Sequence, residues 1–157
     1  MVRLAELPER ERDHLLEKLK DLSGFDGRPW VSGPPLARRR VALVTTAGLH
    51  RRCDRPFAAG AAGTDYRVIP GDVAAGDLVM SHLSVNFDRT GFQQDLNVVF
   101  PIDRLRGLAA EGVIGAVADF HYSFMGAAPI RSLEPRARQL ARLLKQDRVD
   151  AVLLTPV

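Results

Sequence analysis

Short apolar runs alternate with segments of helical periodicity from residue 40 to residue 157, and this alternation limits the folds open to the chain. The helical segments are Ile102 to Glu111 and Glu134 to Gln146, and Gly112 stands where a helix C-cap glycine belongs. The predicted strands are the run RVALVTTAG from Arg40, Tyr66 to Ile69, Leu78 to Ser81, Val113 to Ala118 and Val149 to Leu154. This order predicts a doubly wound α/β fold, Rossmann- or flavodoxin-like, in which helices flank a short, mostly parallel sheet.

The last run, VDAVLL, has no polar alternation and predicts an interior strand that is apolar on both faces. A strand of this kind usually leads into a loop and a helix that cover the sheet, so the predicted sheet is short of one layer.

Residues 1–39 have a different character. Leu15, Leu16 and Leu19 recur at helical spacing among charged residues after Pro8, which predicts a helix from Glu9 to Leu22. The stretch SGFDGRPWVSGPPLARRR that follows is rich in glycine and proline and predicts an extended arm, with Phe25 and Trp30 as anchors. We therefore expect a helical arm over 1–39 and an α/β domain over 40–157.

The composition excludes several classes of protein. The single cysteine, Cys53, rules out an internal disulfide, and the charged start of the chain does not resemble a signal peptide. No segment approaches the ~20 apolar residues of a membrane span. The net charge of +3, with few aromatic residues among the arginines, argues against nucleic acid as a partner. We expect a soluble, cytoplasmic protein.

Three of the four histidines follow predicted strands: His50, His82 and His121. In a parallel sheet the carboxyl ends of the strands meet at one edge, so these three imidazoles are expected to share a cleft there. The alternative is that loops simply collect polar residues. His14 lies in the charged first helix and is expected to be a surface residue.

The segment SHLSVNFDRTGFQQDLNVVFPIDRL is unusually polar for a connection of this length. His82 lies within a few residues of Asn86 and Asp88, and an imidazole with a nearby carboxylate can transfer or orient protons. Asn97 and Asp103 are better explained as turn and capping residues before the helix that Pro101 opens.

Other kinds of site have weaker support. Imidazole and carboxylate groups suit zinc or iron, but the candidate ligands lack the spacing that places two of them on one helical face. These candidates are His50, His82, His121, Asp88 and Asp95. No metal is therefore predicted, and no phosphate-binding glycine motif is present. Cys53 lies among arginines in HRRCD and is either a reactive thiol or an inert residue.

Several motifs together resemble a known family. ALVTTAGLH, DYRVIPGD, SHLSVNFD, DLNVVFPIDRL, GVIGAVADFHYSFMG and VDAVLLTPV are similar, in order and spacing, to the selenoprotein B family of glycine, sarcosine, betaine and D-proline reductases. NVVFPIDRL and HYSFMG resemble the D-proline reductase branch most. The resemblance runs from about Val41 to Val157 and does not include the N-terminal arm.

The resemblance implies a reductase that cleaves a carbon–nitrogen bond of an amino acid or betaine-type substrate. In the family, a strand similar to VDAVLLTPV leads directly into a catalytic selenocysteine or cysteine, so the nucleophile is expected just after Val157. No cofactor is expected within this chain. The implied partners are a subunit that carries a pyruvoyl group and a dithiol or thioredoxin-like reductant, and an oligomer is expected.

The resemblance also suggests roles for individual residues. His82, Asp88 and His121 are the expected catalytic residues, as proton donors or orienting groups. The expected substrate-pocket residues are His50, Ser84, Asn86, Tyr122, Ser123 and Thr155. The alternative is a non-catalytic binding or assembly module that lacks the nucleophile.

Overall fold

The computed structural model describes residues 3–20, 27, 30–58, 63–82, 89–126, 128 and 130–157. The chain divides into two units, Met1–Ser32 and Gly33–Val157, which are described separately.

The first unit contains the 3-10 turn η1 (Leu4–Glu6) and the helix α1 (Glu9–Lys20). The Pro8 carbonyl accepts two hydrogen bonds from the first turn of α1, so the helix begins where the sequence predicts. Trp30 is 91% exposed and Phe25 lies outside the described residues, so the prediction that they anchor the arm on the body stays a prediction.

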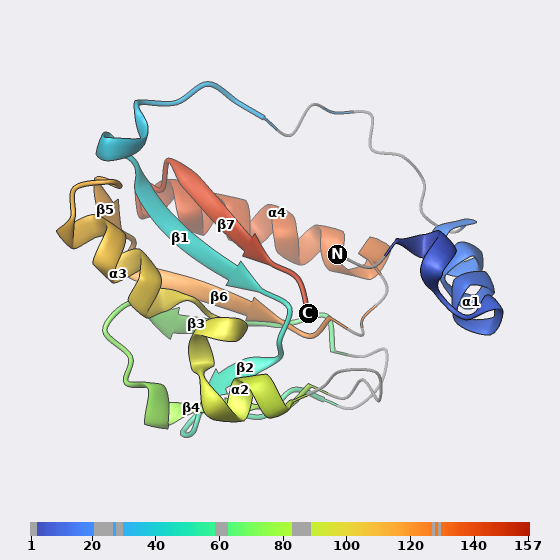
Figure 1. The fold of residues 1–157 in the computed structure, drawn as a ribbon. Coiled ribbons are helices and arrows are strands. Elements are labelled where there is room, and N and C mark those ends of the chain that lie inside the picture. Colours follow the sequence, from blue (N-terminus) through green and yellow to red (C-terminus); the bar gives the residue numbers. More distant parts are fainter. Residues whose placement is uncertain are drawn as a thin grey trace. The chain divides into compact units, whose positions relative to one another are not determined.

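The second unit is built around a mixed sheet with β1 (Arg40–Thr45) at its centre (Figure 1). On one side β1 pairs in parallel with β5 (Ala116–Val117) and then with β6 (Phe120–Phe124). On the other side it pairs in parallel with β7 (Ala151–Thr155). β3 (Tyr66–Pro70) lies antiparallel to β6. The fold is α/β, and the predicted parallel pairing holds around β1 but not for β3.

A two-stranded antiparallel sheet joins β2 (Leu49–Arg51) to β4 (Leu78–Met80). The sequence pattern predicts neither β2 nor β6, because both contain polar residues where a buried strand usually has apolar ones. Conversely, the strand predicted from Val113 to Ala118 is reduced to the two residues of β5.

The remaining elements of the second unit connect and cover these strands. They are η2 (Leu36–Arg38), η4 (Ala75–Asp77), α2 (Thr90–Gln94), η5 (Leu96–Val98), α3 (Ile102–Ala110) and α4 (Ile130–Gln146). No helix in the described part of the chain is long and apolar enough to cross a membrane.

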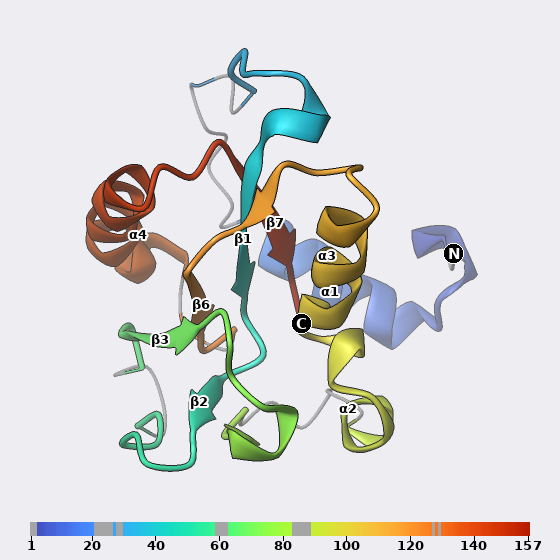
Figure 2. The same cartoon turned by 90° about the vertical axis from the view of Figure 1, so that its left-hand side faces the viewer.

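α3 and α4 cover opposite faces of the sheet (Figure 2). On the α3 face, Ile102 and Leu105 join an apolar cluster with Val41 and Leu43 of β1. On the α4 face, Leu140 packs with other apolar and aromatic side chains, chiefly Val44, Tyr66, Tyr122 and Phe124. Alternate residues of β1 therefore supply the two cores, as the period of a strand requires, and β6 adds Tyr122 and Phe124 to the second.

A polar side chain fixes the start of α3, and a glycine ends it. The Asn97 carbonyl oxygen accepts a hydrogen bond from Asp103 N at 3.1 Å, and the Asn97 amide donates to the Asp103 carboxylate at 3.1 Å. At the other end Gly112 has φ 72°, a conformation that favours glycine. The predicted capping roles of Asn97 and Gly112 are confirmed, whereas the Asp103 carboxylate accepts from the Asn97 and Arg106 side chains and not from a backbone N–H of α3.

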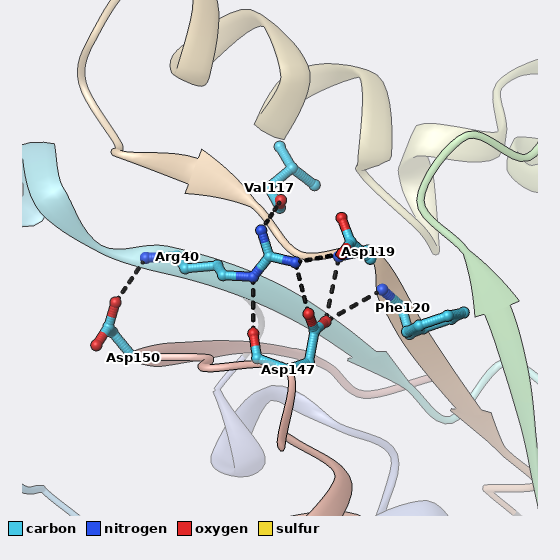
Figure 3. A network of polar contacts seen from close by, with 6 residues as sticks. All are labelled: Arg40, Val117, Asp119, Phe120, Asp147 and Asp150. Carbon is cyan, nitrogen blue, oxygen red and sulfur yellow. Dashed lines mark hydrogen bonds and ion pairs between the residues drawn. The ribbon is translucent and has the colours of Figure 1, made fainter. Parts of the chain in front are cut away.

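A charged network centred on Arg40 holds the amino-terminal edge of the sheet together (Figure 3). The Arg40 guanidinium lies 2.5 Å from the Asp147 carboxylate and 2.9 Å from that of Asp119. The other Asp147 oxygen accepts from Asp119 N and Phe120 N, while Asp150 accepts from Arg40 N. These contacts join β1 to the segments that lead into β6 and β7, and they raise the pKa of Arg40, with Asp147 the largest cause.

β7 is an edge strand of the described sheet, and the prediction that it is interior is wrong. Its only partner there is β1, and Val152, Leu153 and Leu154 are 38%, 40% and 68% exposed. An apolar run predicts burial on both faces, but that burial requires a neighbour on each side, and the described residues supply one.

Candidate functional site

The carboxyl ends of β1 and β7 are joined through two threonines. The Thr46 hydroxyl lies 2.8 Å from Val157 N and 3.3 Å from the Val157 carbonyl oxygen, and Thr46 N donates to the Thr155 carbonyl at 3.2 Å. The Thr45 hydroxyl donates to the same Thr155 carbonyl at 3.2 Å. These bonds fix the backbone from Thr155 to Val157 at the carboxyl edge of the sheet.

Gly126, which follows β6, lies where several backbones approach closely. Its N–H donates to the Thr46 carbonyl at 2.9 Å. A Cβ atom on Gly126 would lie 2.8 Å from the Val157 carbonyl oxygen, 3.0 Å from the Thr46 carbonyl oxygen and 3.2 Å from His82 Nε2. We call these four residues, Thr46, His82, Gly126 and Val157, the carboxyl-edge cluster.

His82 supplies the imidazole of this cluster from the end of β4. The residue is 4% exposed, and its carbonyl accepts a hydrogen bond from the Arg89 guanidinium. Burial, and then the positive charge of Arg89, lower the pKa of His82. The ring is therefore predominantly neutral at pH 7 and can take up a proton.

His50 lies on β2, and hydrogen bonds occupy both of its ring nitrogens. Nδ1 is 2.8 Å from the Arg51 carbonyl and Nε2 is 2.7 Å from the Ser81 hydroxyl. A carbonyl only accepts, so Nδ1 carries the proton and Nε2 accepts from Ser81. His50 thus positions the residue that precedes His82.

His121 follows β5, as predicted, but it lies inside the next strand, β6, and not in a loop. The side chain is fully buried, and its Nδ1 accepts a hydrogen bond from Leu43 N at 2.9 Å. The proton is therefore on Nε2, which has no hydrogen-bond partner among the described residues and lies in a ring that meets Phe100 edge-on. Burial first, and then Arg106, lower the pKa of His121 to about 4. His121 is part of the sheet interior, beneath the carboxyl edge.

The other predicted pocket residues are distributed over both faces of the sheet. Tyr122 packs under α4 against Tyr66, and burial raises its pKa. The Ser123 hydroxyl is buried and accepts from Leu49 N at 2.8 Å, while Thr155 contacts β1 through its carbonyl. Ser84, Asn86 and Asp88 lie outside the described residues.

Thr46 and Gly126 belong to the cluster although sequence reasoning did not single them out. Both occur in motifs that follow strands, TTAG and HYSFMG, and a small or hydroxyl residue directly after a parallel strand is the signal that points to them. The closest atoms in this cluster are the backbone carbonyl oxygens of Thr46 and Val157, and the His82 imidazole lies slightly farther from Gly126.

Cys53 lies elsewhere, on the rim of an open cavity of about 450 Å³. The cavity is lined by Arg51, Arg52, Cys53, Pro70, Asp72, Val73, Ala74 and Asp77. Arg51 is engaged by Asp54 at 2.9 Å. None of the carboxyl-edge cluster lines this cavity. The residues that the structure describes also contain no group of three or more side chains suited to hold a metal ion.

Comparison with known proteins gives a consistent match. The D-proline reductase subunit gamma of Acetoanaerobium sticklandii is 43% identical over 117 residues, which are 73% of this chain and 47% of that protein. The glycine reductase complex component B subunit gamma of Symbiobacterium thermophilum is 31% identical over 85% of this chain and 32% of its own length. The betaine reductase complex component B subunit beta of Peptoclostridium acidaminophilum is 28% identical over 95% of this chain and 32% of its own length.

The chain thus spans about half or less of the length of these curated relatives. No solved structure shows significant similarity to it. The model of the glycine/sarcosine/betaine reductase selenoprotein B family matches residues 34–157, which include every member of the carboxyl-edge cluster. The chain therefore belongs to this selenoprotein B family, whose members named above are components of reductase complexes.

Proposed function

We propose that this chain is part of a reductase subunit that breaks a carbon–nitrogen bond of an amino acid or betaine-type substrate, with a selenol or thiol nucleophile directly after Val157. The observation that carries the proposal is the carboxyl-edge cluster, because a residue after Val157 would leave the sheet beside the His82 imidazole. The doubly wound, Rossmann- or flavodoxin-like topology predicted from the sequence stays a prediction for this mixed sheet. In open α/β sheets the carboxyl ends of parallel strands are where ligands bind, which also supports the placement.

The proposed reaction has three steps. The selenolate or thiolate attacks the substrate α-carbon, the new carbon–selenium or carbon–sulfur bond forms, and the amine leaves with the carbon–nitrogen electron pair and takes up a proton. A thiol of a dithiol reductant then attacks the selenium or sulfur, and the released carbon takes up a proton. The second thiol of the reductant frees the nucleophile, so the dithiol supplies two electrons and becomes a disulfide.

His82 has the role of proton carrier in this scheme. A neutral imidazole can take the proton of a thiol, and the imidazolium can give it to the departing amine. Asp88, with Ser84 and Asn86, belongs to the proposal through the family resemblance. His121 supports the cluster from beneath, through β1. A pyruvoyl group on a partner subunit would hold the substrate amine.

A second candidate is a binding or assembly module without catalysis. It is favoured by one observation, which is that no thiol lies in the carboxyl-edge cluster and Cys53 lines a different cavity. The two candidates differ in the coding sequence that they require after codon 157.

The first test is the gene itself, where the proposal expects an in-frame UGA or cysteine codon at position 158 and further coding sequence. The second is a chain extended with that sequence and with cysteine at position 158. The alkylation rate of each cysteine-containing peptide of the extended chain is measured by mass spectrometry as a function of pH. We expect the pKa of this thiol to lie below the ~8.5 of free cysteine, and His82→Gln to slow alkylation at pH 7 by roughly tenfold.

Cys53→Ser is the matched control and should leave the reactivity of position 158 unchanged. Ordinary reactivity of the thiol at position 158 would favour the second candidate. Loss of the reactivity of position 158 in Cys53→Ser, with the fold intact by circular dichroism, would assign the nucleophile to Cys53.

A further inference from the structure

The positive charge of the second unit is concentrated on one helix, α4. Residues 130–148 contain six arginine and lysine residues and two acidic residues, whereas the rest of residues 33–157 contains ten residues of each sign. The surplus of positive charge in this unit therefore lies on α4 and the turn that follows it. A gene rich in arginine codons would spread arginine along the chain and would not collect the surplus on one element.

Four of these cations form a row along the outer side of α4, which we call the basic stripe. They are Arg131, Arg138, Arg142 and Lys145. Successive members are seven, four and three residues apart, which keeps them on one side of a helix, and all four are exposed. The opposite side of α4 packs on the sheet, chiefly through the buried Leu140 (Figure 2). At 1.5 Å per residue the basic stripe is about 21 Å long.

The stability of the helix does not account for the basic stripe. Arg138, Arg142 and Lys145 are neighbours at i,i+4 and i,i+3, where like charges destabilise a helix. Arg131 lies in the first turn, which contains no acidic residue, although the helix dipole favours negative charge there. Arg138 pairs with Glu134 at 2.7 Å, but Arg142 and Lys145 form no ion pair with a described residue. Only Lys145, in the last turn, suits the dipole.

The surroundings of the basic stripe favour a protein over other acidic partners. Single-stranded nucleic acid is usually held by aromatic side chains next to the cations, and α4 contains no aromatic residue. A helix that binds a membrane surface inserts its apolar side into the lipid, whereas that side of α4 is held in the core by Leu140, which is 5% exposed. A row of carboxylates on another protein requires neither feature and matches the stripe in charge.

We propose that the basic stripe of α4 is a docking surface for an acidic protein partner that presents a row of carboxylates of similar length. Such contacts speed association and weaken as salt is added. The stripe contains no member of the carboxyl-edge cluster, so its test is independent of the proposed function.

The first probe is a fluorescently labelled helical peptide of about 20 residues with glutamate along one face. Anisotropy should show that it binds the 157-residue chain, and that binding weakens at least ~tenfold between about 50 and about 300 mM salt. The same peptide with glutamine in place of glutamate should not bind. Arg142→Gln combined with Lys145→Gln should weaken binding of the glutamate peptide by roughly tenfold.

The matched control combines Arg38→Gln with Arg55→Gln. Both arginines are exposed, lie outside α4 and form no ion pair with a described residue. This control removes the same charge and should change binding by less than about twofold. The double variant of the stripe should keep or slightly raise the thermal midpoint, because it removes like-charge neighbours. Equal weakening by the two double variants would assign binding to net charge and overturn the proposal.

Lys145 allows a test with the natural partner, because it is the only lysine among residues 33–157. A carbodiimide joins a lysine amine directly to a carboxylate in contact with it. In an extract of cells that produce the protein, we expect mass spectrometry to find Lys145 joined to an acidic segment of another protein. Arg138→Gln with Arg142→Gln, which keeps Lys145, should reduce this cross-link at least ~fivefold.

Other results would assign the basic stripe differently and overturn the proposal. Duplex DNA of about 20 base pairs could bind more tightly than the peptide and lose this binding only in the stripe variant, which would indicate nucleic acid. The same pattern with phosphatidylglycerol vesicles would indicate a membrane. Cross-links of Lys145 only to carboxylates of this chain would indicate contacts within the chain or with a second copy. A lowered thermal midpoint of the stripe variant would make the stripe part of the fold.

Discussion

At the scale of single residues, the second unit uses its buried polar groups to replace missing backbone partners. His121 is the clearest example, because its Nδ1 accepts from Leu43 N where the short β5 and the later start of β6 leave β1 without a backbone acceptor. The same ring cannot be protonated on Nδ1 without losing this bond. Its neutral form is therefore the one that the fold requires.

This requirement gives a pH dependence of stability. The pKa of His121 is about 4 in the folded chain and near 6.5 when unfolded, so the unfolded chain binds the proton first as the pH falls. The stabilisation is fully present above pH ~6.5 and is lost progressively down to pH ~4, by roughly 3 kcal/mol. His121→Gln, which keeps an acceptor but does not titrate, should flatten the fall in urea-unfolding free energy over this range.

His14→Gln is the control, since His14 is exposed in α1 and its replacement should leave the pH profile as it is. Parallel profiles for the original chain and His121→Gln would show that other groups, such as His82, carry the acid sensitivity.

The close approach at Gly126 leads to a second prediction. A methyl group there would lie 2.8 Å from the Val157 carbonyl and 3.0 Å from that of Thr46, and both atoms are backbone. We expect Gly126→Ala to lower the free energy of unfolding by about 1–3 kcal/mol in urea. Gly107→Ala in α3 is the matched control. It has open space within 4 Å and should be neutral or stabilising by up to ~1 kcal/mol. Equal effects of the two substitutions would contradict the crowding at Gly126.

At the scale of elements, the sequence pattern predicts those whose burial follows a simple rule. β1, β3, β4, α3 and α4 lie close to their predicted ranges, because their apolar periodicity reflects one or two buried faces. β6 was missed because FHYSF buries a histidine, a tyrosine and a serine. His121 and Ser123 accept hydrogen bonds from distant backbone N–H groups and Tyr122 packs against Tyr66, contacts that no local pattern reveals. The edge position of β7 was also missed. An apolar run indicates that a strand is suited to burial between neighbours, but it does not show whether those neighbours are present.

The candidate site was predicted to a similar extent. The sequence indicated the edge of the sheet and His82, but not that His121 lies below this edge or that Thr46 and Gly126 complete the cluster. Those facts depend on register between strands that are far apart in sequence.

The Arg40 network shows how elements are joined at the opposite edge. The Asp147 side chain is only 12% exposed and links β1 to the segments before β6 and β7. Asp147→Ala should therefore lower the free energy of unfolding by about 2–4 kcal/mol, because it leaves a partly buried guanidinium and two backbone N–H groups without their acceptor. Chemical denaturation measures this.

The control is Glu134→Ala, which breaks the solvent-exposed pair with Arg138 on α4 and should cost no more than about 0.5 kcal/mol. If Asp147→Ala lowers the free energy of unfolding as little as the control does, the network contributes no more to stability than a surface ion pair.

At the scale of the whole molecule, both apolar clusters consist of residues of the second unit. We expect a chain that begins at Gly33 to fold by itself, with a thermal midpoint within about 3 °C of that of the 157-residue chain, because no cluster residue is removed. Calorimetry with near-ultraviolet circular dichroism measures this. A truncated chain that loses its cooperative transition would show that Met1–Ser32 contributes to the fold of the second unit.

The central position of β1 has a consequence for synthesis on the ribosome. β1 is made early, yet each of its strand partners is made much later, with Leu43 bonded to a residue 78 positions ahead and Arg40 to one 110 positions ahead. The apolar run of β1 must therefore wait, unpaired, while residues 46–115, nearly half of the 157, are translated. Contacts of such long range slow folding, and the waiting segment is the one that a chaperone is expected to shield on the nascent chain.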